Sequence, residues 1–322
     1  MDGRQDSVVD TANSSAEGGR QLSAEDFMPL SEEEKDSEFI AMESKTFMQD
    51  AWNRYRRNYL AMAGLFVVTC IVLLAIFGPM VSPYSYEQQD ITSTNVLPSS
   101  THFFGTDKFG RDIYTRILYG ARISLSVAAA AASINLVIGI VFGGTAGYIG
   151  GRVDMVMMRL VDILYSIPTM LYVILIMLLF GANIISIMVG ICVSNWVGMA
   201  RIVRSQVMSL KQQEFAMAAQ VMGASKMRIL IRHLVLNSMG PIIVTVTLMI
   251  PQAIFLEAFL SFAGVGISPP QASWGALAQN AKQLVDTYPI QVIWPVAAIS
   301  ITMLALNFVG DGLNEALDPK KR

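Results

Sequence analysis

Charged residues are scarce in this chain. Only 15% of its 322 residues are Asp, Glu, Lys or Arg, whereas 53% are hydrophobic. Average soluble proteins contain about 25% charged residues. The mean hydropathy is +0.48. This balance argues against an ordinary soluble enzyme, a nucleic-acid-binding protein and a disordered chain, and it indicates a membrane protein.

The residues that usually carry catalysis are also few. The two cysteines, Cys70 and Cys192, lie in apolar runs, so we expect free thiols rather than a disulfide. The two histidines, His102 and His233, fall on opposite sides of the predicted membrane, which excludes a two-histidine metal site within one subunit. The sequence contains no P-loop, His-Glu-x-x-His or Gly-x-Ser-x-Gly motif. We therefore predict a chain without a catalytic centre, a metal site, a cofactor or an ATP-binding motif of its own.

Charge is distributed unevenly along the chain. Residues 1–50 contain 13 acidic and 4 basic residues, while residues 51–322 contain 12 acidic and 19 basic residues. Residues 1–45 are rich in Ser, Asp, Glu and Gly, and such a composition cannot bury enough apolar area to offset the entropy lost on folding. We interpret 1–45 as a disordered acidic cytoplasmic tail attached to a basic, membrane-embedded body.

Long stretches without charge mark the membrane spans, because a spanning helix needs about 20 mostly apolar residues. The stretch between Asp162 and Arg201 has 38 uncharged residues, enough for two spans with a turn at 181–183. The predicted spans are residues 59–81, 122–148, 155–180, 184–203, 236–262 and 289–310. Gly and Pro residues interrupt 264–270, so we expect a loop after the fifth span. The predicted fold class is all-α: a polytopic membrane protein with six transmembrane helices.

Six spans place both termini on the same side of the membrane. If that side is the cytoplasm, 14 of the 19 basic residues after residue 50 lie in cytoplasmic segments and five lie outside. The positive-inside rule favours this orientation. Both termini are therefore expected in the cytoplasm.

The polar segment 82–121 lies outside in this topology. Its stretch 104–112 combines glycines with Asp and Thr, which is turn chemistry, and Asp112 is placed to cap a helix that begins at Ile113. Two interpretations remain open: a folded cap on the bundle, or a contact for a ligand or an external partner. The candidate residues of this motif are Gly105, Asp107, Gly110, Arg111 and Asp112.

The polar segment 201–235 lies inside. A helical repeat of apolar and small residues comprises Phe215, Ala218, Ala219 and Met222. Gly223 can end this helix in a left-handed conformation, and Ser225 can cap a second one. The segment therefore predicts two short helices at an angle, with small residues at the corner. On these residues alone, docking of another protein and an amphipathic membrane-surface helix are equally open.

Ionisable residues in membrane spans are costly and usually face the bundle interior. Arg159 and Asp162 are three residues apart, and we predict that they pair with each other as a structural feature. Glu257, near the outer end of the fifth span, has no Lys or Arg within 24 positions on either side. It is expected to pair with another helix, to face water or to line the pathway. We take Glu257 and Ser261 as candidate pathway or gate residues.

A series of motifs follows in order between residues 50 and 320. They are Phe-Gly-Thr-Asp-Lys-Phe-Gly-Arg-Asp (104–112), Tyr-Gly-Ala-Arg-Ile-Ser-Leu (119–125), Gly-Tyr-Ile-Gly-Gly-Arg-Val-Asp (147–154), Met-Arg-Leu-Val-Asp (158–162), Ala-Arg-Ile-Val-Arg (200–204), Glu-Ala-Phe-Leu-Ser-Phe-Ala-Gly-Val-Gly (257–266), Pro-Pro-Gln-Ala-Ser-Trp-Gly (269–275), Asn-Phe-Val-Gly-Asp-Gly-Leu (307–313) and Leu-Asp-Pro (317–319). With these motifs in register, the chain resembles the C-type inner-membrane permease subunits of dipeptide, oligopeptide and nickel ABC importers.

The resemblance implies a type I ABC importer transmembrane domain at 119–312. An N-terminal helix, the first span and an extracellular loop would precede it at 46–118, and a short cytoplasmic tail would follow at 313–322. It also implies a bacterial cytoplasmic membrane location. The implied partners are a homologous second permease, two cytoplasmic ATPase subunits, an extracellular solute-binding protein and the lipid bilayer, with no nucleic acid.

The resemblance further implies that 201–235 is a coupling segment that docks on an ATPase subunit. The candidate coupling residues are Glu214, Ala218, Ala219, Gly223, Ala224 and Ser225. The family's signature is similar to Glu-Ala-Ala, three residues, Gly, nine residues and Ile-x-Leu-Pro. Here Met217 stands at the Glu position and Leu236 at the Pro position. The chain therefore lacks a charge for a salt bridge at 217 and a helix breaker at 236.

The expected cargo is peptides, since the sequence shows no metal-chelating cluster. A permease of the same architecture for nickel or another small solute is the alternative. An ion-coupled secondary transporter is a second alternative, but it would need intramembrane carboxylates and often internal repeats, and only Glu257 is an unpaired candidate. A membrane-anchored signalling or scaffolding protein that uses the acidic tail is a third.

Overall fold

The computed structural model describes residues 46–318, so the predicted acidic tail at 1–45 lies outside the described residues. The main helices are α2 (Phe47–Arg57), α3 (Tyr59–Val81), α4 (Ile113–Ile149), α5 (Gly151–Tyr165), α6 (Thr169–Phe180), α7 (Ile184–Lys211), α8 (Glu214–Val221), α9 (Lys226–Arg228), α10 (Met239–Phe262), α11 (Trp274–Ala281) and α12 (Ile290–Leu317). A π-helical segment, η3 (Ile229–Val235), precedes α10. Short 3-10 turns lie at Ile91–Ser93 and Lys282–Leu284.

The all-α prediction is confirmed for the described part of the chain, in which no strand occurs. Five helices are long and apolar enough to cross a membrane: α3, α4, α7, α10 and α12. The pair α5 and α6 passes the same test together, but the two are bent by 78° at a short break. Counting this pair as one span gives the six predicted spans.

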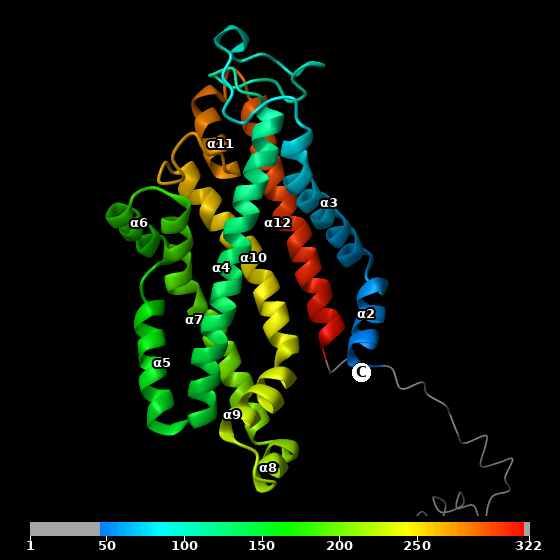
Figure 1. Cartoon of the computed structure of the whole chain (residues 1–322), viewed down its shortest axis with the longest axis vertical. Coiled ribbons are helices and arrows are strands. Elements are labelled where there is room, and N and C mark those ends of the chain that lie inside the picture. Colours follow the sequence, from blue (N-terminus) through cyan, green and yellow to red (C-terminus); the bar gives the residue numbers. More distant parts are fainter. Residues whose placement is uncertain (1–45, 319–322) are drawn as a thin grey trace, which may run out of the picture. The chain divides into compact units, whose positions relative to one another are not determined.

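The third predicted span, 155–180, is wrong as a single helix. α5 ends at Tyr165 and α6 starts at Thr169. Pro168 lacks a backbone N–H and disfavours a helical conformation at Ile167, so the helix cannot continue through this point. Figure 1 shows α6 turned away from the line of α5 at the edge of the bundle.

The second span begins nine residues earlier than predicted, at Ile113. Asp112 caps it by accepting from the Thr115 backbone N–H at 2.8 Å. Two charged residues lie inside the helix because their guanidinium groups reach main-chain carbonyls. Arg116 Nη1 donates to the Tyr86 carbonyl at 2.7 Å, and Arg122 Nη2 donates to the Ile76 carbonyl at 2.8 Å. A charged residue is therefore a poor marker of the helix boundary here.

Glycines on one face of α4 allow α7 to pack against it. A Cβ at Gly143 would collide with the Ala200 carbonyl of α7, and one at Gly147 would lie 2.8 Å from the Arg204 carbonyl. Small residues four apart are a common solution for close helix packing in membranes, since they let the backbones approach. α4 and α7 thus form a tightly packed pair, and α10 and α12 pack beside them (Figure 1).

The bundle has two ends with different structures. We call the end formed by residues 82–112 and 263–289 the cap end, and the end formed by residues 212–228 the corner end (Figure 1). The cap end contains α11, whereas the sequence predicted only a loop there. Ser273 caps α11 by accepting from the Ala276 N–H at 3.2 Å, and the Trp274 indole N–H donates to the Ile117 carbonyl of α4 at 3.1 Å. These two contacts fix a helix that is too short to span a membrane.

Candidate functional site

The corner end has the backbone conformation predicted for it. Gly223 lies in the left-handed region with φ +80°. The Ala224 N–H donates to the Ala219 carbonyl at 3.1 Å, which closes the end of α8. Ser225 caps the next helix by accepting from the Arg228 N–H at 3.4 Å. α8 and α9 are therefore two short helices that meet at a glycine.

α8 has a buried face and an exposed face. Ala216 and Ala219 are each 3% exposed and belong to a cluster of apolar side chains, which we call the corner core. The corner core comprises Met199, Val203, Val207, Ala216, Ala219, Ile229, Leu234, Ile242 and Met249. Ala218 lies on the exposed face of the helix. Of the two signature alanines, only Ala218 is thus available to a partner, while Ala219 holds α8 on its own chain.

The exposed face of α8 is largely apolar. Val221 is 89% exposed and Met222 is 81% exposed. Met217, at the Glu position of the signature, is 51% exposed. Glu214 is also exposed, in the first turn of α8. A cluster of exposed large apolar side chains is typical of an interaction surface.

The entry to α10 is helical at the position where the family's signature has a proline. With Leu236 in its place, the chain continues helically from Lys226 through η3 to α10. The Ser238 N–H donates to the carbonyls of both Leu234 and Val235 at 3.0 Å. π-helical turns are rare in proteins overall, and those that occur often lie at functional sites. The corner is therefore joined to α10 by a wide helical turn rather than by a loop.

Two aspartates of α5 pair with arginines of α7. Asp154 accepts from the guanidinium group of Arg204 through both oxygens, and one of these distances is 2.6 Å. Asp162 pairs with Arg201 at 2.8 Å. The predicted pairing of Arg159 with Asp162 is therefore wrong, because the partner comes from the neighbouring helix rather than from the same one.

The motif at 104–112 forms a folded cap. Asp107 accepts from the Phe109 N–H at 2.8 Å and from Arg111 Nε at 2.7 Å. Asp112 accepts from Thr115, as described above, and its other oxygen lies 2.9 Å from His102 Nδ1. Arg111 and Asp112 are 5% and 4% exposed. These motif side chains stabilise their own loop.

Glycine is required at two turns of this motif. Gly105 and Gly110 have φ values of +79° and +72°, and a Cβ at Gly110 would collide with the Asp90 carbonyl. Gln291 of α12 fixes the loop further by donating to Asn95 Oδ1 at 2.9 Å and to the Thr106 carbonyl at 3.0 Å. The exposed large apolar side chains of the cap are Ile91, Leu97, Phe103 and Phe109, of which only Phe109 belongs to the 104–112 motif.

Glu257 is fully buried, at 0% exposure. It accepts from Ser261 Oγ at 2.8 Å and from Ser124 Oγ of α4 at 3.0 Å. The Trp274 backbone N–H donates to the same Ser124 hydroxyl at 3.4 Å, and Ser273 Oγ lies 3.5 Å from Ser261 Oγ. This polar cluster joins α4 and α10 to the start of α11. Among the sequence alternatives, pairing with another helix matches this geometry.

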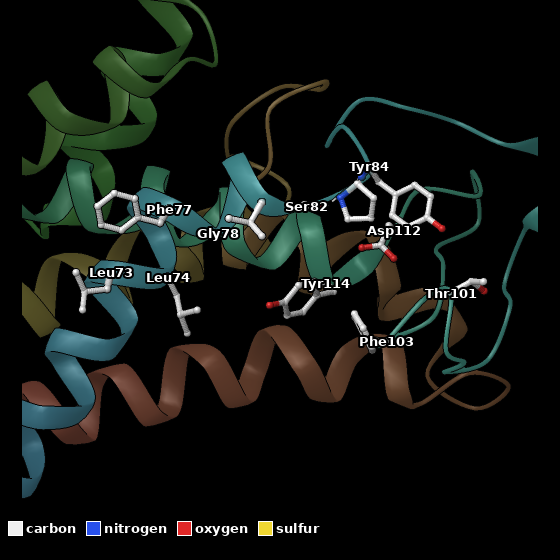
Figure 2. A pocket seen from close by; sticks show the side chains of 12 residues that line it. Leu73, Leu74, Phe77, Gly78, Ser82, Tyr84, Thr101, Phe103, Asp112 and Tyr114 are labelled. Atoms are coloured by element: carbon white, nitrogen blue, oxygen red, sulfur yellow. Dashed lines mark hydrogen bonds between the residues drawn. The ribbon is translucent and has the colours of Figure 1, made fainter.

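An apolar cavity of about 430 Å³ lies between the cap and the end of α3. Figure 2 shows Leu73, Leu74 and Phe77 of α3 on one side of it and Tyr84 and Phe103 of the cap on the other. Apolar side chains below and tyrosine near polar loops are typical of a membrane–water interface.

A second cavity, of about 450 Å³, lies in the middle of the bundle. It is bounded by the break between α5 and α6, by the middle of α7 and by the middle of α10. Its walls include Ser194, Asn195 and Gly198 of α7 and Gln252 of α10. We call it the mid-bundle cavity. Charged residues do not mark this cavity, so the sequence did not predict its lining. The signal present in the sequence was an amide side chain inside an otherwise apolar span.

Comparisons with known proteins agree with this architecture. Residues 139–322 match the family of binding-protein-dependent transport system inner membrane components, and residues 46–98 match the N-terminal TM domain of oligopeptide transport permease C. The chain is 45% identical to the dipeptide transport system permease protein DppC of Bacillus subtilis over 98% of both chains. It is 45% identical to the oligopeptide transport system permease protein OppC of Bacillus subtilis, over 92% of this chain and 97% of that one.

A third relative is the oligopeptide transport system permease protein OppC of Escherichia coli. It is 44% identical over 89% of this chain and 95% of that one. Both family matches and all three relatives thus point to one group of membrane proteins. The chain belongs to the binding-protein-dependent transport system inner membrane components, among the C-type permease subunits of peptide ABC importers.

Proposed function

We propose that this chain is the permease subunit that forms half of a translocation pathway for peptides in an ATP-driven importer. A homologous second permease supplies the other half, and an extracellular solute-binding protein delivers the cargo. The carrying observation is the similarity, over nearly the full length, to permeases of dipeptide and oligopeptide transport systems. The six apolar segments of the bundle support the transport role.

The corner end is proposed to dock on a cytoplasmic ATPase subunit. Its support is the exposed apolar face of α8, which has no covering element in its own chain among residues 46–318. Val221 and Met222 project from this face, and Ala218 leaves room for a partner backbone. A second support is the match of Ala218 and Gly223 to the family's cytoplasmic signature. Two ATPase subunits would then serve the two permeases.

The corner end is proposed to face the cytoplasm. Basic side chains lie in the corner end and in the parts of α5, α7 and η3 on the same half of the bundle: Arg152, Arg159, Arg201, Arg204, Lys211, Lys226, Arg228 and Arg232. The positive-inside rule assigns such an end to the cytoplasm. The folded cap then faces the solute-binding protein, and both termini lie in the cytoplasm.

The test is affinity purification of the tagged full chain from detergent-solubilised bacterial membranes, followed by identification of its partners. We expect a second permease, two ATPase subunits and a solute-binding protein whose bound ligand is a peptide. Uptake of labelled trialanine by cells that carry or lack the chain provides the functional measurement. Recovery of the chain without ATPase subunits, in a preparation that still transports trialanine, would refute the coupling role.

A further inference from the structure

The mid-bundle cavity lies beside the midpoints of two long helices, α7 and α10. Asn195 and Gly198 stand near the midpoint of α7, which runs from Ile184 to Lys211. Gln252 stands near the midpoint of α10, which runs from Met239 to Phe262. Both helices are long and apolar enough to span. The break between α5 and α6, where Tyr165 is exposed, forms the remaining wall.

Amide side chains at this depth need a polar environment. Asn195 Oδ1 lies 3.4 Å from Ser194 Oγ, and Ser194 Oγ donates to Thr169 Oγ1 at 3.0 Å. The Gln252 side chain is exposed in the single chain and makes no hydrogen bond within residues 46–318. An amide that faced acyl chains would lose its hydrogen bonds to water without replacement. The wall of the cavity therefore requires water, a polar ligand or polar groups of a partner chain in front of it.

Gly198 leaves open space in front of this wall. A Cβ placed on it would meet no atom within 4 Å, whereas a Cβ on Gly143 would collide with α7. The packing of the chain itself therefore does not require a glycine at 198. The free volume lies on the cavity side, directly beside Asn195.

The lining contains no Asp, Glu, Lys or Arg. Neutral amides offer both donors and acceptors, which are the groups that complement peptide main-chain N–H and C=O groups. The nearest charges, Arg201 and Asp162, neutralise each other at 2.8 Å, and Arg201 stacks on Tyr165 at 4.3 Å. Such a surface would complement the main chain that all peptides share, whatever the charge of their side chains.

We propose that the mid-bundle cavity is this chain's share of the peptide pathway, in which Asn195 and Gln252 hydrogen-bond to the main chain of the peptide in transit. The inference rests on the proposed function and adds the residues that meet the cargo. Met199 and Met249 line the cavity and also belong to the corner core. A displacement of α8 thus reaches the cavity wall through continuous packing.

The first test is cysteine accessibility in the complete importer, with Cys70 and Cys192 replaced by alanine. Gly198→Cys and Gln252→Cys should react with a charged, water-soluble methanethiosulfonate reagent, and trialanine with ATP should change the rate. Leu304→Cys on α12, which is 55% exposed on an apolar surface, is the matched control and should not react. Failure of both cavity cysteines to react, with and without ATP, would overturn the inference.

The second test separates a pathway role from a structural one. Gln252→Leu should raise the KM for trialanine about 3- to 10-fold, as expected for one lost neutral hydrogen bond, with unchanged membrane level and ATPase co-purification. Gln252→Asn should restore part of the loss. Gly198→Leu should lower the maximal rate, because it fills the space rather than removing a polar group. Parental uptake by both leucine variants would overturn the inference.

The two proposals fail in different ways. If the parent importer does not transport trialanine but both cavity cysteines react, the peptide assignment is refuted and the pathway assignment stands. If the parent transports trialanine and the cysteines are inert, the peptide assignment stands and the pathway lies elsewhere. If the parent importer does not transport trialanine and neither cavity cysteine reacts, both proposals fail.

Discussion

Replacing Gly223 with leucine tests the coupling proposal most directly. Gly223 has φ +80°, and a Cβ there costs about 1–2 kcal/mol of backbone strain. Apart from its chain neighbours, no atom of the described residues lies within 4 Å of that Cβ position, so the Cβ itself meets no clash there. The strain acts on the turn that closes α8, through the 3.1 Å bond from the Ala224 N–H to the Ala219 carbonyl. The spanning helices lie outside this turn and should insert normally.

We expect Gly223→Leu to reach parental levels in the membrane, to lose ATPase co-purification and to lose peptide uptake. The matched control is Gly223→Asn, because asparagine is close to leucine in size but tolerates the left-handed conformation. If backbone strain causes the loss, Gly223→Asn keeps docking. If a steric block at the ATPase surface causes it, both variants lose docking and Gly223→Ala is milder. Parental docking and uptake by Gly223→Leu would refute the coupling role of the corner.

Three further changes have expected outcomes. Gly143→Leu should destabilise the bundle by about 1–3 kcal/mol, because its side chain overlaps the α7 backbone; a lower melting temperature of the purified complex and a lower membrane level measure this. Single cysteines at Ser99 and Gln283 should be labelled from outside intact cells and one at Ser209 should not, and external labelling of Ser209 would reverse the orientation. Glu257→Ala should cost about 2–4 kcal/mol of stability, because two buried serine hydroxyls lose their acceptor, and Glu257→Gln should cost less. A Glu257→Ala complex that melts at the temperature of the parent complex would contradict this.

The spans were predictable because each is a long apolar segment, the property on which crossing a bilayer chiefly depends. α3 was placed at 59–81, the bounds the structure has. The start of α4 was not predictable from charge, because Arg116 and Arg122 are satisfied by carbonyls from a segment more than 25 residues away in sequence. The bend after Tyr165 was readable in principle, since Pro168 lies three residues later. The long uncharged stretch between Asp162 and Arg201 favoured one unbroken helix, although Pro168 interrupts it.

The corner and the cap show a different limit. The left-handed glycine and the serine cap at 223–225 depend on local chemistry, so the sequence alone predicts them. Which face of α8 is buried depends on α7 and η3, and the sequence assigned Ala219 to the partner surface although it packs into the corner core. The partners of Asp154 and Asp162 also come from α7. Tertiary contacts determine the buried face of α8 and the partners of both aspartates, whereas helical spacing predicts only contacts between residues of the same helix.

The packing of the corner core suggests how the two ends of the chain communicate in the proposed importer. α8 attaches to α7 and to the entry of α10 through buried alanines, so a pull on α8 acts on both helices at once. The pairs from Asp154 and Asp162 carry the same movement to α5. These are the helices that bound the mid-bundle cavity. Because packed interiors have low compressibility and transmit strain, closure of the ATPase subunits would change the width of the cavity rather than deform the corner.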